Sequence, residues 1–296
     1  MSSFIIETPK EFSFHQCLHF LNRSPNELLH LTQGEQVQKI IRVHDKTILF
    51  SIETDLQNQL VVSVLNQRTT ATLQQAICSY VTDWFDLKTD LKPFYAFASN
   101  DPILKSLVKK YAGYRIVGMP DLFEALSWAI IGQQINLSFA YRLKQQFVQS
   151  FGEKFSWKER TYYHFPAAEL VAGLNPASLL ALQFSRQKAE YVIATAKAFA
   201  SGVISKEQLS LLSFPEAKER LIKLKGIGNW TANYVLMKTF HYPNAFPLED
   251  AGLHQAIRRQ LNLSAKPTLQ QIEQLFKKYK GWEAYATLYL WRSLSE

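Results

Sequence analysis

One stretch of the sequence, LKGIGNWTANYVLMKTFHYPNAFPLEDAGLHQAI from Leu224 to Ile257, places a glycine turn close to a lone acidic pair. Gly226 and Gly228 form a tight turn between two predicted helices, and glycine lets a backbone approach another molecule closely. The first N–H groups of the second helix lack intrahelical partners and carry partial positive charge, so they can hold a phosphate. Such a turn is also common as a plain helix connection, so by itself it is weak evidence for binding and leaves both interpretations open.

An aromatic pair and an acidic pair follow the turn. Trp230 and Tyr234 are four residues apart and share one helix face, either as part of a core stripe or as the wall of a pocket. Glu249 and Asp250 stand at the head of the next predicted helix, where an aspartate commonly serves as the N-cap. The helix dipole also stabilises an ionised carboxylate there. Asp250 is therefore either a structural cap or a carboxylate available for chemistry.

The overall composition favours an anionic partner. Lys and Arg number 33 against 25 Asp and Glu, which gives a net charge of +8, and such a basic balance is typical of nucleic-acid binding as well as of some soluble proteins without that role. Cys17 and Cys78 are far apart, which argues against a disulfide framework, a zinc ribbon and an iron–sulfur cluster. No apolar run is long enough to span a membrane, and no signal-peptide pattern opens the chain. We therefore expect a cytoplasmic protein with access to nucleic acid.

The elements that must position these residues fall into two regions. Three short segments rich in β-branched residues predict an antiparallel meander, and a helical apolar spacing follows them at residues 71–85. After residue 102, a 3.6-residue periodicity predicts helices nearly throughout. The predicted strands cover residues 36–43, 46–53 and 60–66, and the predicted helices cover residues 122–131, 139–151, 186–202 and 214–224.

These patterns predict an α+β chain. A small N-terminal domain with an antiparallel sheet covers residues 1–95, and a larger all-α domain covers residues 96–296. The boundary is placed within Lys88–Pro102, which mixes Pro, Asp, Asn and Ser. Residues 153–166 are predicted to form a long surface loop.

The segments LKGIGNWTANYVL and FPLEDAGLHQAI together resemble the helix–hairpin–helix DNA glycosylase superfamily, in which an L-x-G-[IV]-G hairpin precedes a single aspartate by about twenty residues. Within that superfamily the chain is similar to the DNA-3-methyladenine glycosylase II family. Three further segments agree in the expected order: Ala125–Leu143, Phe184–Gly202 and Gly281–Trp291.

The resemblance implies a monofunctional glycosylase that flips an alkylated purine of the 3-methyladenine type out of double-stranded DNA and hydrolyses its glycosidic bond, in base excision repair. It implies that Asp250 stabilises the oxocarbenium-like sugar and orients water. Trp230, Tyr234 and Trp282 would stack on the electron-poor base. A monomer is expected.

The resemblance also assigns the DNA contacts. Gly226, Ile227 and Gly228 would clamp one phosphate without reading sequence. Either Gln134 or Ile135 would fill the gap left by the flipped base, although the glutamines could also be mere polar surface between helices.

The family's hairpin also holds a monovalent cation, Na⁺ or K⁺, through backbone carbonyls that fall on Ile222, Leu224 and Ile227. No other cofactor is expected.

Two rival functions remain. An oxidised-purine glycosylase with lyase activity would need a lysine in the hairpin helix, but the endonuclease III pattern places that position at Trp230, and an indole cannot form a Schiff base. A DNA binder without catalytic activity would not need Asp250. We therefore predict a glycosylase without lyase activity.

Overall fold

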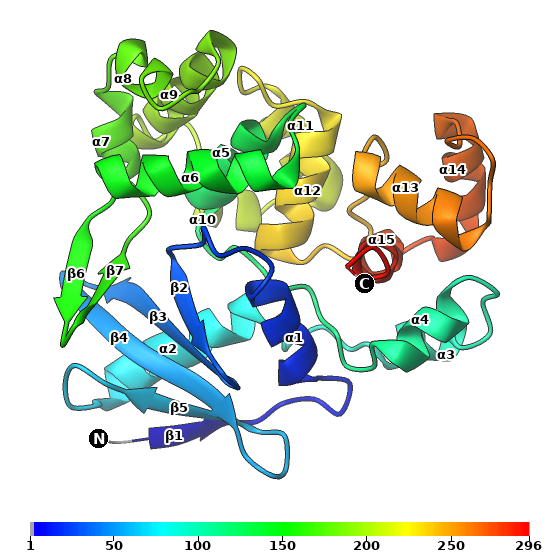
Figure 1. Cartoon of the computed structure of the whole chain (residues 1–296), viewed down its shortest axis with the longest axis horizontal. Coiled ribbons are helices and arrows are strands. Elements are labelled where there is room, and N and C mark those ends of the chain that lie inside the picture. The colour runs from blue at the N-terminus through cyan, green and yellow to red at the C-terminus, as the bar shows by residue number, and fades with distance from the viewer. Residues whose placement is uncertain (1–2, 296) are drawn as a thin grey trace.

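The chain is described from a computed structural model, which covers residues 3–295. A five-stranded antiparallel sheet with two helices forms the N-terminal part, and a larger helical part lies beside it (Figure 1). The strand order is β1-β5-β4-β3-β2. The strands are β1 Ser3–Ile6, β2 His30–Gln33, β3 Gln36–Val43, β4 Lys46–Thr54 and β5 Leu60–Val64, and the two helices are α1 Phe14–Leu21 and α2 Ala71–Trp84.

The predicted meander is confirmed by β3, β4 and β5, which pair consecutively. Ile41 faces Ile48 across β3 and β4, and Ile52 faces Val62 across β4 and β5. The β-branched residues that predicted these strands therefore meet as cross-strand pairs. The edge strands β1 and β2 escaped prediction, since each has only four residues and little alternation.

The rest of the chain is mainly helical, which confirms the predicted order of a sheet followed by a helical region. Residue 95, the predicted domain limit, lies inside α3, and the domain limits stay a prediction. Among residues 3–295, no helix is long and apolar enough to cross a membrane. The helices are α3 Lys92–Ala98, α4 Leu104–Lys110, α5 Leu122–Gly132, α6 Leu137–Phe151, α7 Ala168–Ala172, α8 Pro176–Leu180, α9 Arg186–Ala200, α10 Lys206–Ser210, α11 Phe214–Ile222, α12 Asn229–Phe240, α13 Ala251–Gln260, α14 Leu269–Phe276, the 3₁₀ turn η1 Lys277–Tyr279, and α15 Glu283–Arg292.

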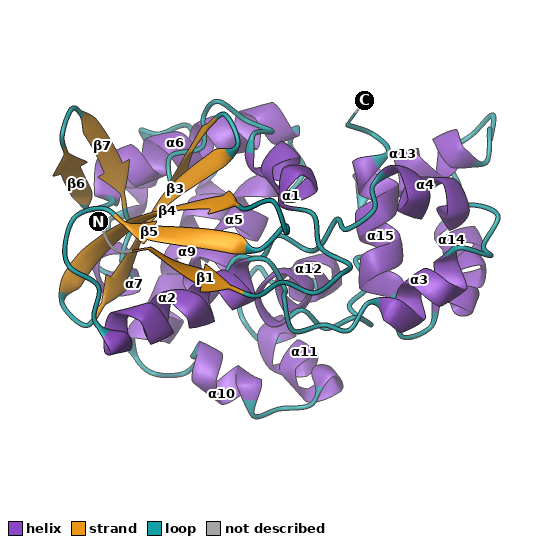
Figure 2. Cartoon of the chain, turned by 90° about the horizontal axis from the view of Figure 1, so that it is seen from below, coloured by secondary structure: helices purple, strands orange, loops and turns teal. Residues whose placement is uncertain are grey.

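The helical part is divided into two lobes. One carries α5 to α12, and the other carries α13, α14 and α15 together with α3 and α4, as Figure 2 shows from below. Helix α4 packs on α15 although more than 170 residues separate them in the sequence. The chain thus leaves the sheet, builds part of the second lobe, crosses to the first lobe and returns.

The prediction of a surface loop at residues 153–166 is wrong. It contains a hairpin of β6 Lys154–Trp157 and β7 Arg160–Tyr163, which packs against β3. Tyr162 joins Ile40 and Leu49 in a small cluster on the sheet, and its hydroxyl donates to Gln38 Oε1 at 2.6 Å. The alternation of aromatic and polar residues in this segment is that of a half-buried strand, and the hairpin fastens the helical part to the N-terminal sheet.

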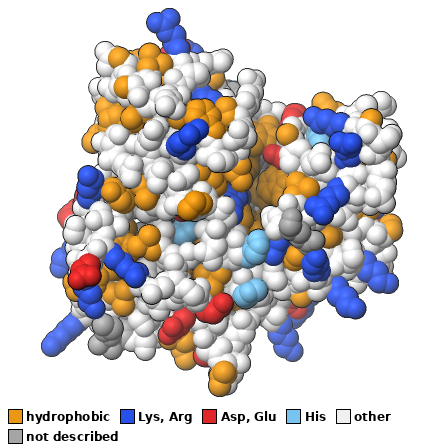
Figure 3. All heavy atoms as spheres, viewed as in Figure 1, with side chains coloured by type: hydrophobic (Ala, Val, Ile, Leu, Met, Phe, Trp, Pro, Cys, Tyr) orange, Lys and Arg blue, Asp and Glu red, His pale blue; other side chains and the backbone are white. Residues whose placement is uncertain are grey.

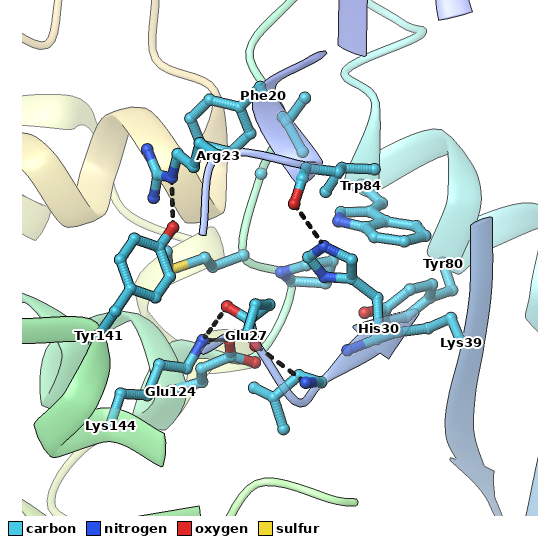
Figure 4. Close-up of a pocket in the computed structure, with 16 residues that line it drawn as sticks. Phe20, Arg23, Glu27, His30, Lys39, Tyr80, Trp84, Glu124, Tyr141 and Lys144 are labelled. Atoms are coloured by element: carbon cyan, nitrogen blue, oxygen red, sulfur yellow. Dashed lines mark hydrogen bonds and ion pairs between the residues drawn. The ribbon is translucent and has the colours of Figure 1, made fainter. Parts of the chain in front are cut away.

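A buried ion cluster also joins the two parts. Lys144 of α6 contacts Glu27 at 3.0 Å and Glu124 of α5 at 3.1 Å, and Arg23 donates to the Tyr141 hydroxyl nearby (Figure 4). Burial by itself would raise the pKa of Glu27, but the Lys144 ammonium, His30 and the hydrogen bonds to the carboxylate together outweigh burial and lower that pKa to about 2. The adjoining cavity measures about 40 Å³, which is room for water and not for a purine base. The ion cluster therefore acts as a fixed junction between the N-terminal sheet and the helical part.

Candidate active site

Helices α11 and α12 form the predicted hairpin, with a turn between them at residues 223–228. Gly226 adopts φ +87°, and a Cβ there would lie 2.2 Å from the Tyr191 ring. Gly226 is therefore required by the hairpin itself. Gly228 has φ −92° and ψ −177°, which any residue can adopt, and a Cβ there would meet no atom within 4 Å. The protein's own packing gives no reason for a glycine at position 228.

Two N–H groups of the turn have no protein acceptor among residues 3–295. Within residues 3–295, the backbone N–H groups of Gly226 and Gly228 donate no hydrogen bond, whereas that of Ile227 donates to Leu224 O at 3.1 Å. Ile227 is buried and anchors the turn. Free donors at the start of a helix form an anion site.

Asp250 is the N-cap of α13, and three donors fix its carboxylate. Oδ1 accepts the backbone N–H of Leu253 at 2.7 Å and the indole N–H of Trp291 at 2.8 Å. Oδ2 accepts the indole N–H of Trp230 at 3.0 Å. A carboxylate can accept about four hydrogen bonds, so Oδ2 retains acceptor capacity. The side chain is partly exposed, and this oxygen can face a ligand.

The segment that precedes Asp250 in the chain is held in place from two sides. The buried Asn233 of α12 accepts the backbone N–H of Phe246 at 3.0 Å, and Nε2 of His254 donates to Leu248 O at 2.7 Å. Both are internal polar groups that find partners in this segment. Asn233 therefore links the hairpin helix to the segment before Asp250, a role that the sequence alone did not reveal.

Glu249, the neighbouring carboxylate, faces elsewhere. It is exposed and accepts one hydrogen bond, from Asn229 Nδ2 at 2.8 Å. It lacks the indole donors that hold Asp250. The two acidic residues therefore occupy different environments, and Asp250 is the one beside the aromatic cluster.

The aromatic cluster around Asp250 consists of Trp230, Tyr234 and Trp291. The Trp230 and Tyr234 rings stack at 5.3 Å, and the Trp291 ring lies 6.3 Å from Tyr234. Behind them, the buried Trp128 donates its indole N–H to the Tyr234 hydroxyl at 3.0 Å. Burial raises the pKa of Tyr234, so its phenol stays neutral.

Trp282 is not part of this cluster, and its prediction as a pocket residue is corrected. Its ring packs 5.7 Å from Phe94 and 6.2 Å from Tyr285. Trp282 and Trp291 stand at opposite ends of α15, nine residues apart, which amounts to about 13 Å along the axis and a rotation of roughly 180°. Only one of them can face Asp250. The segment GWEAYATLYLW contains both tryptophans. Their spacing of nine residues on one helix was the sequence signal that they face opposite sides, so that only one of them could belong to the pocket.

The loop between α5 and α6 is tied to the hairpin. Gln133 Nε2 donates to Gly226 O at 3.0 Å and to Thr231 Oγ1 at 3.2 Å. Gln134 is exposed and adopts φ +56°, an unfavourable region for a glutamine. Ile135 is partly buried against the core. Of the two predicted wedge residues, Gln134 is thus the exposed one.

A cleft opens between the two lobes, and hydrophobic side chains line its walls (Figure 3). The cleft lies between the lobe that carries α11 and α12 and the lobe that carries α13 and α14. The predicted phosphate site and Asp250 belong to these two lobes respectively.

The backbone carbonyls predicted to bind a cation have few competing donors. Within residues 3–295, the carbonyls of Ile222 and Ile227 accept no hydrogen bond, and that of Leu224 accepts one. Oxygen ligands of this kind suit a hard cation. No group of three or more His, Cys, Asp or Glu residues in this part of the chain could hold a metal ion.

Residues 127–281 match the HhH-GPD superfamily base excision DNA repair protein family, and residues 6–126 match the N-terminal domain of 8-oxoguanine DNA glycosylase. The chain is 40% identical over 292 residues to the DNA-3-methyladenine glycosylase of Bacillus subtilis, covering 98% of this chain and 96% of that protein. The chain therefore belongs to the HhH-GPD superfamily of base excision DNA repair proteins and, within it, to the DNA-3-methyladenine glycosylases.

Solved structures share the whole fold. The 3-methyladenine DNA-glycosylase of Archaeoglobus fulgidus superposes with a TM-score of 0.83 at 22% identity, over 98% of this chain and 97% of that one. The 8-oxoguanine glycosylase/lyase of Clostridium acetobutylicum superposes with a TM-score of 0.75 at 20% identity, over 98% and 95% of the two chains. A glycosylase with lyase activity therefore shares this fold, and the fold does not decide whether the present chain has that activity.

Proposed function

We propose that the protein excises alkylated purines of the 3-methyladenine type from double-stranded DNA by hydrolysis, without cleaving the strand. The observation that carries this proposal is the Asp250 carboxylate, held by Trp230 and Trp291 at the head of α13. It belongs to one of the two lobes that border the cleft, and the hairpin of the other lobe carries two free backbone donors, the N–H groups of Gly226 and Gly228. A carboxylate, an aromatic wall and a phosphate clamp are the three groups that such a reaction needs.

The chemistry assigned to Asp250 is electrostatic. Breaking the glycosidic bond leaves positive charge on the sugar, and a fixed carboxylate stabilises that charge as it develops. The indole and backbone donors hold the carboxylate in one orientation before the substrate arrives. The remaining acceptor position of Oδ2 can orient the attacking water. A cationic alkylated base is already a good leaving group, so no separate general acid is required.

The aromatic rings supply the pocket. Trp230, Tyr234 and Trp291 present electron-rich faces, and stacking a cationic base on them gains about 1–2 kcal/mol by cation–π attraction. The base must leave the duplex to reach them, and the exposed Gln134 is our choice for the side chain that fills the gap. Its bulk and position beside the tethered Gln133 support that role.

The hairpin is assigned to one DNA phosphate. The free N–H groups of Gly226 and Gly228 would donate to the phosphate oxygens without reading sequence. The carbonyls of Ile222, Leu224 and Ile227 would hold Na⁺ or K⁺, whose charge would reinforce the same contact. The absence of a competing hydrogen bond at two of these carbonyls supports that assignment.

The direct test is to incubate the protein with methylated duplex DNA and identify the products. We expect free 3-methyladenine and an intact abasic strand, because water attacks the sugar. Sodium borohydride should trap no covalent protein–DNA adduct during turnover, since borohydride reduces a Schiff base and none forms. Failure to release any alkylated base would refute the proposed activity.

The positions of the lysines near the hairpin support the expectation that borohydride traps no covalent adduct. Lys225 contacts Glu190 at 3.3 Å on the surface. Lys238 is buried, donates to Val117 O, and lies about 12 Å beyond Trp230 along the helix. Burial lowers the pKa of Lys238 well below its usual value, but this amine is enclosed by protein. A trapped adduct that maps to either lysine would instead establish a lyase.

A second prediction concerns Trp291. Trp291→Phe keeps an aromatic ring but removes a hydrogen bond to Asp250 Oδ1. We expect the single-turnover rate of base release to fall about tenfold, as is typical for the loss of a hydrogen bond to a charged group. Trp282→Phe is the matched control and should change the rate by less than about twofold. Equal effects of the two substitutions would show that the indole N–H of Trp291 does not position Asp250.

A further inference from the structure

A groove between α13 and α14 lies apart from the site described above. Its volume is about 540 Å³, within the range of about 300–1,000 Å³ common for ligand pockets. It stands at the C-terminal end of α13, about 16 Å along the helix axis from Asp250 at the other end. The groove is therefore not part of the base pocket. Its apolar walls come from Ile257, Leu261, Leu263, Pro267, Ile272 and Leu275.

The rim of this groove exposes large apolar side chains. Leu261 is 41% exposed and Leu263 is 37% exposed, while Ile257 and Ile272 form a buried floor beneath them. Neighbouring leucines that remain accessible beside an apolar hollow mark a surface able to bury another apolar group.

The groove is also fixed in shape. The side chain of Arg258 donates to Leu263 O and to Ser264 O, both at 3.3 Å, which holds the connecting loop. Thr268 and Gln271 form a capping box at the start of α14. A preformed groove does not have to be ordered when a ligand binds, which lowers the entropic cost of binding.

Positive charge borders the groove on one side of α14, where the chain leaves that helix. Lys277 and Lys278 line it, and no carboxylate does. Lys278 is paired with Asp101 at 2.6 Å, whereas the side chain of Lys277 forms no ion pair or hydrogen bond within the described part of the chain. Figure 3 shows Lys and Arg side chains gathered over this lobe. Between residues 251 and 282 the sequence has one acidic residue, Glu273, against Arg258, Arg259, Lys266, Lys277, Lys278 and Lys280.

We propose that this groove binds an acidic peptide segment of a partner protein. Bulky apolar side chains of the peptide would pack against Leu261 and Leu263, and its carboxylates would pair with Lys277. A DNA backbone would match the charge but has no bulky apolar side chains to fill the floor of the groove. A second copy of this chain would bring a net charge of +8 against an already basic lobe. Docking here would leave the Asp250 end of α13 free, so partner binding and base excision are compatible.

The test uses a fluorescein-labelled heptapeptide, Glu-Glu-Leu-Leu-Phe-Glu-Glu, titrated with the full chain and followed by fluorescence anisotropy. Two matched peptides replace the glutamates with lysine or the apolar residues with serine. We expect the acidic apolar peptide to bind at least about tenfold more tightly than either. Leu263→Ser and Lys277→Glu should each weaken its binding about tenfold.

The matched control variants lie outside the groove. Leu211→Ser changes a leucine that is 88% exposed elsewhere, and Lys46→Glu changes an exposed lysine on β4. Each should alter peptide binding by less than about twofold. Leu263→Ser should keep the circular-dichroism spectrum and nearly the melting temperature of the wild type, which shows that it is folded without relying on the proposed activity.

Three results would overturn the proposal. The first is a lack of selectivity. Either the wild-type chain binds all three peptides equally, or the acidic apolar peptide binds the groove variants as tightly as it binds the control variants. The second is a loss of affinity for undamaged duplex DNA in Lys277→Glu as large as the loss of peptide affinity, which would assign the groove to the DNA surface. The third is a concentration-dependent dimer, seen by sedimentation and abolished by Leu263→Ser, which would assign it to a second copy.

Discussion

Asp250→Asn is expected to reduce base release from methylated duplex DNA by about three orders of magnitude while leaving DNA affinity nearly unchanged. The substitution keeps the size of the side chain and its oxygen acceptor but removes the negative charge. That charge stabilises the sugar cation in the transition state and contributes little to binding the intact duplex. Single-turnover base release and anisotropy with an undamaged duplex measure the two effects separately.

Glu249→Gln is the matched control for this result. Glu249 is adjacent in sequence but accepts its one hydrogen bond from Asn229 and is exposed to solvent. Its substitution should change the rate by less than about twofold. If Asp250→Asn retained most of the activity while Glu249→Gln lost it, the carboxylate would have been assigned to the wrong residue.

Gly228→Val is expected to weaken binding to damaged and undamaged DNA alike, by roughly ten- to a hundredfold. The valine side chain would stand over the free N–H groups at the start of α12 and keep a phosphate away from them. The folded protein should tolerate it, because a Cβ at this position meets open space and the backbone is extended. The melting temperature should therefore stay close to that of the wild type.

Gly226→Ala distinguishes the role of Gly226 from that of Gly228. A Cβ at position 226 would overlap the Tyr191 ring, and its φ of +87° is strained for alanine. We expect a melting temperature several degrees lower, together with weaker DNA binding. Normal DNA binding by Gly228→Val would show that the hairpin is not the phosphate clamp.

The sequence by itself determined the local parts of this protein. The hairpin between α11 and α12 follows from two glycines between periodic apolar stripes, and the cap at Asp250 follows from an aspartate before such a stripe. The central strands were legible because β-branched residues recur in them over five to nine residues. All these features depend on neighbours within a few residues, which is the range that a sequence pattern records.

The tertiary structure decided which distant residues meet. Trp291 reaches Asp250 and Trp282 does not, because the phase of α15 and its packing against α13 select one face of the helix. The hairpin β6–β7 is supported by its packing against β3 of the N-terminal sheet. Its strands are too short to be predicted from the sequence without that contact. Gln133 and Asn233 gain their roles from backbone groups dozens of residues away or on another element. Local patterns set the helices, strands and caps, but contacts between elements depend on how their faces are oriented in three dimensions, and a linear spacing does not encode that orientation.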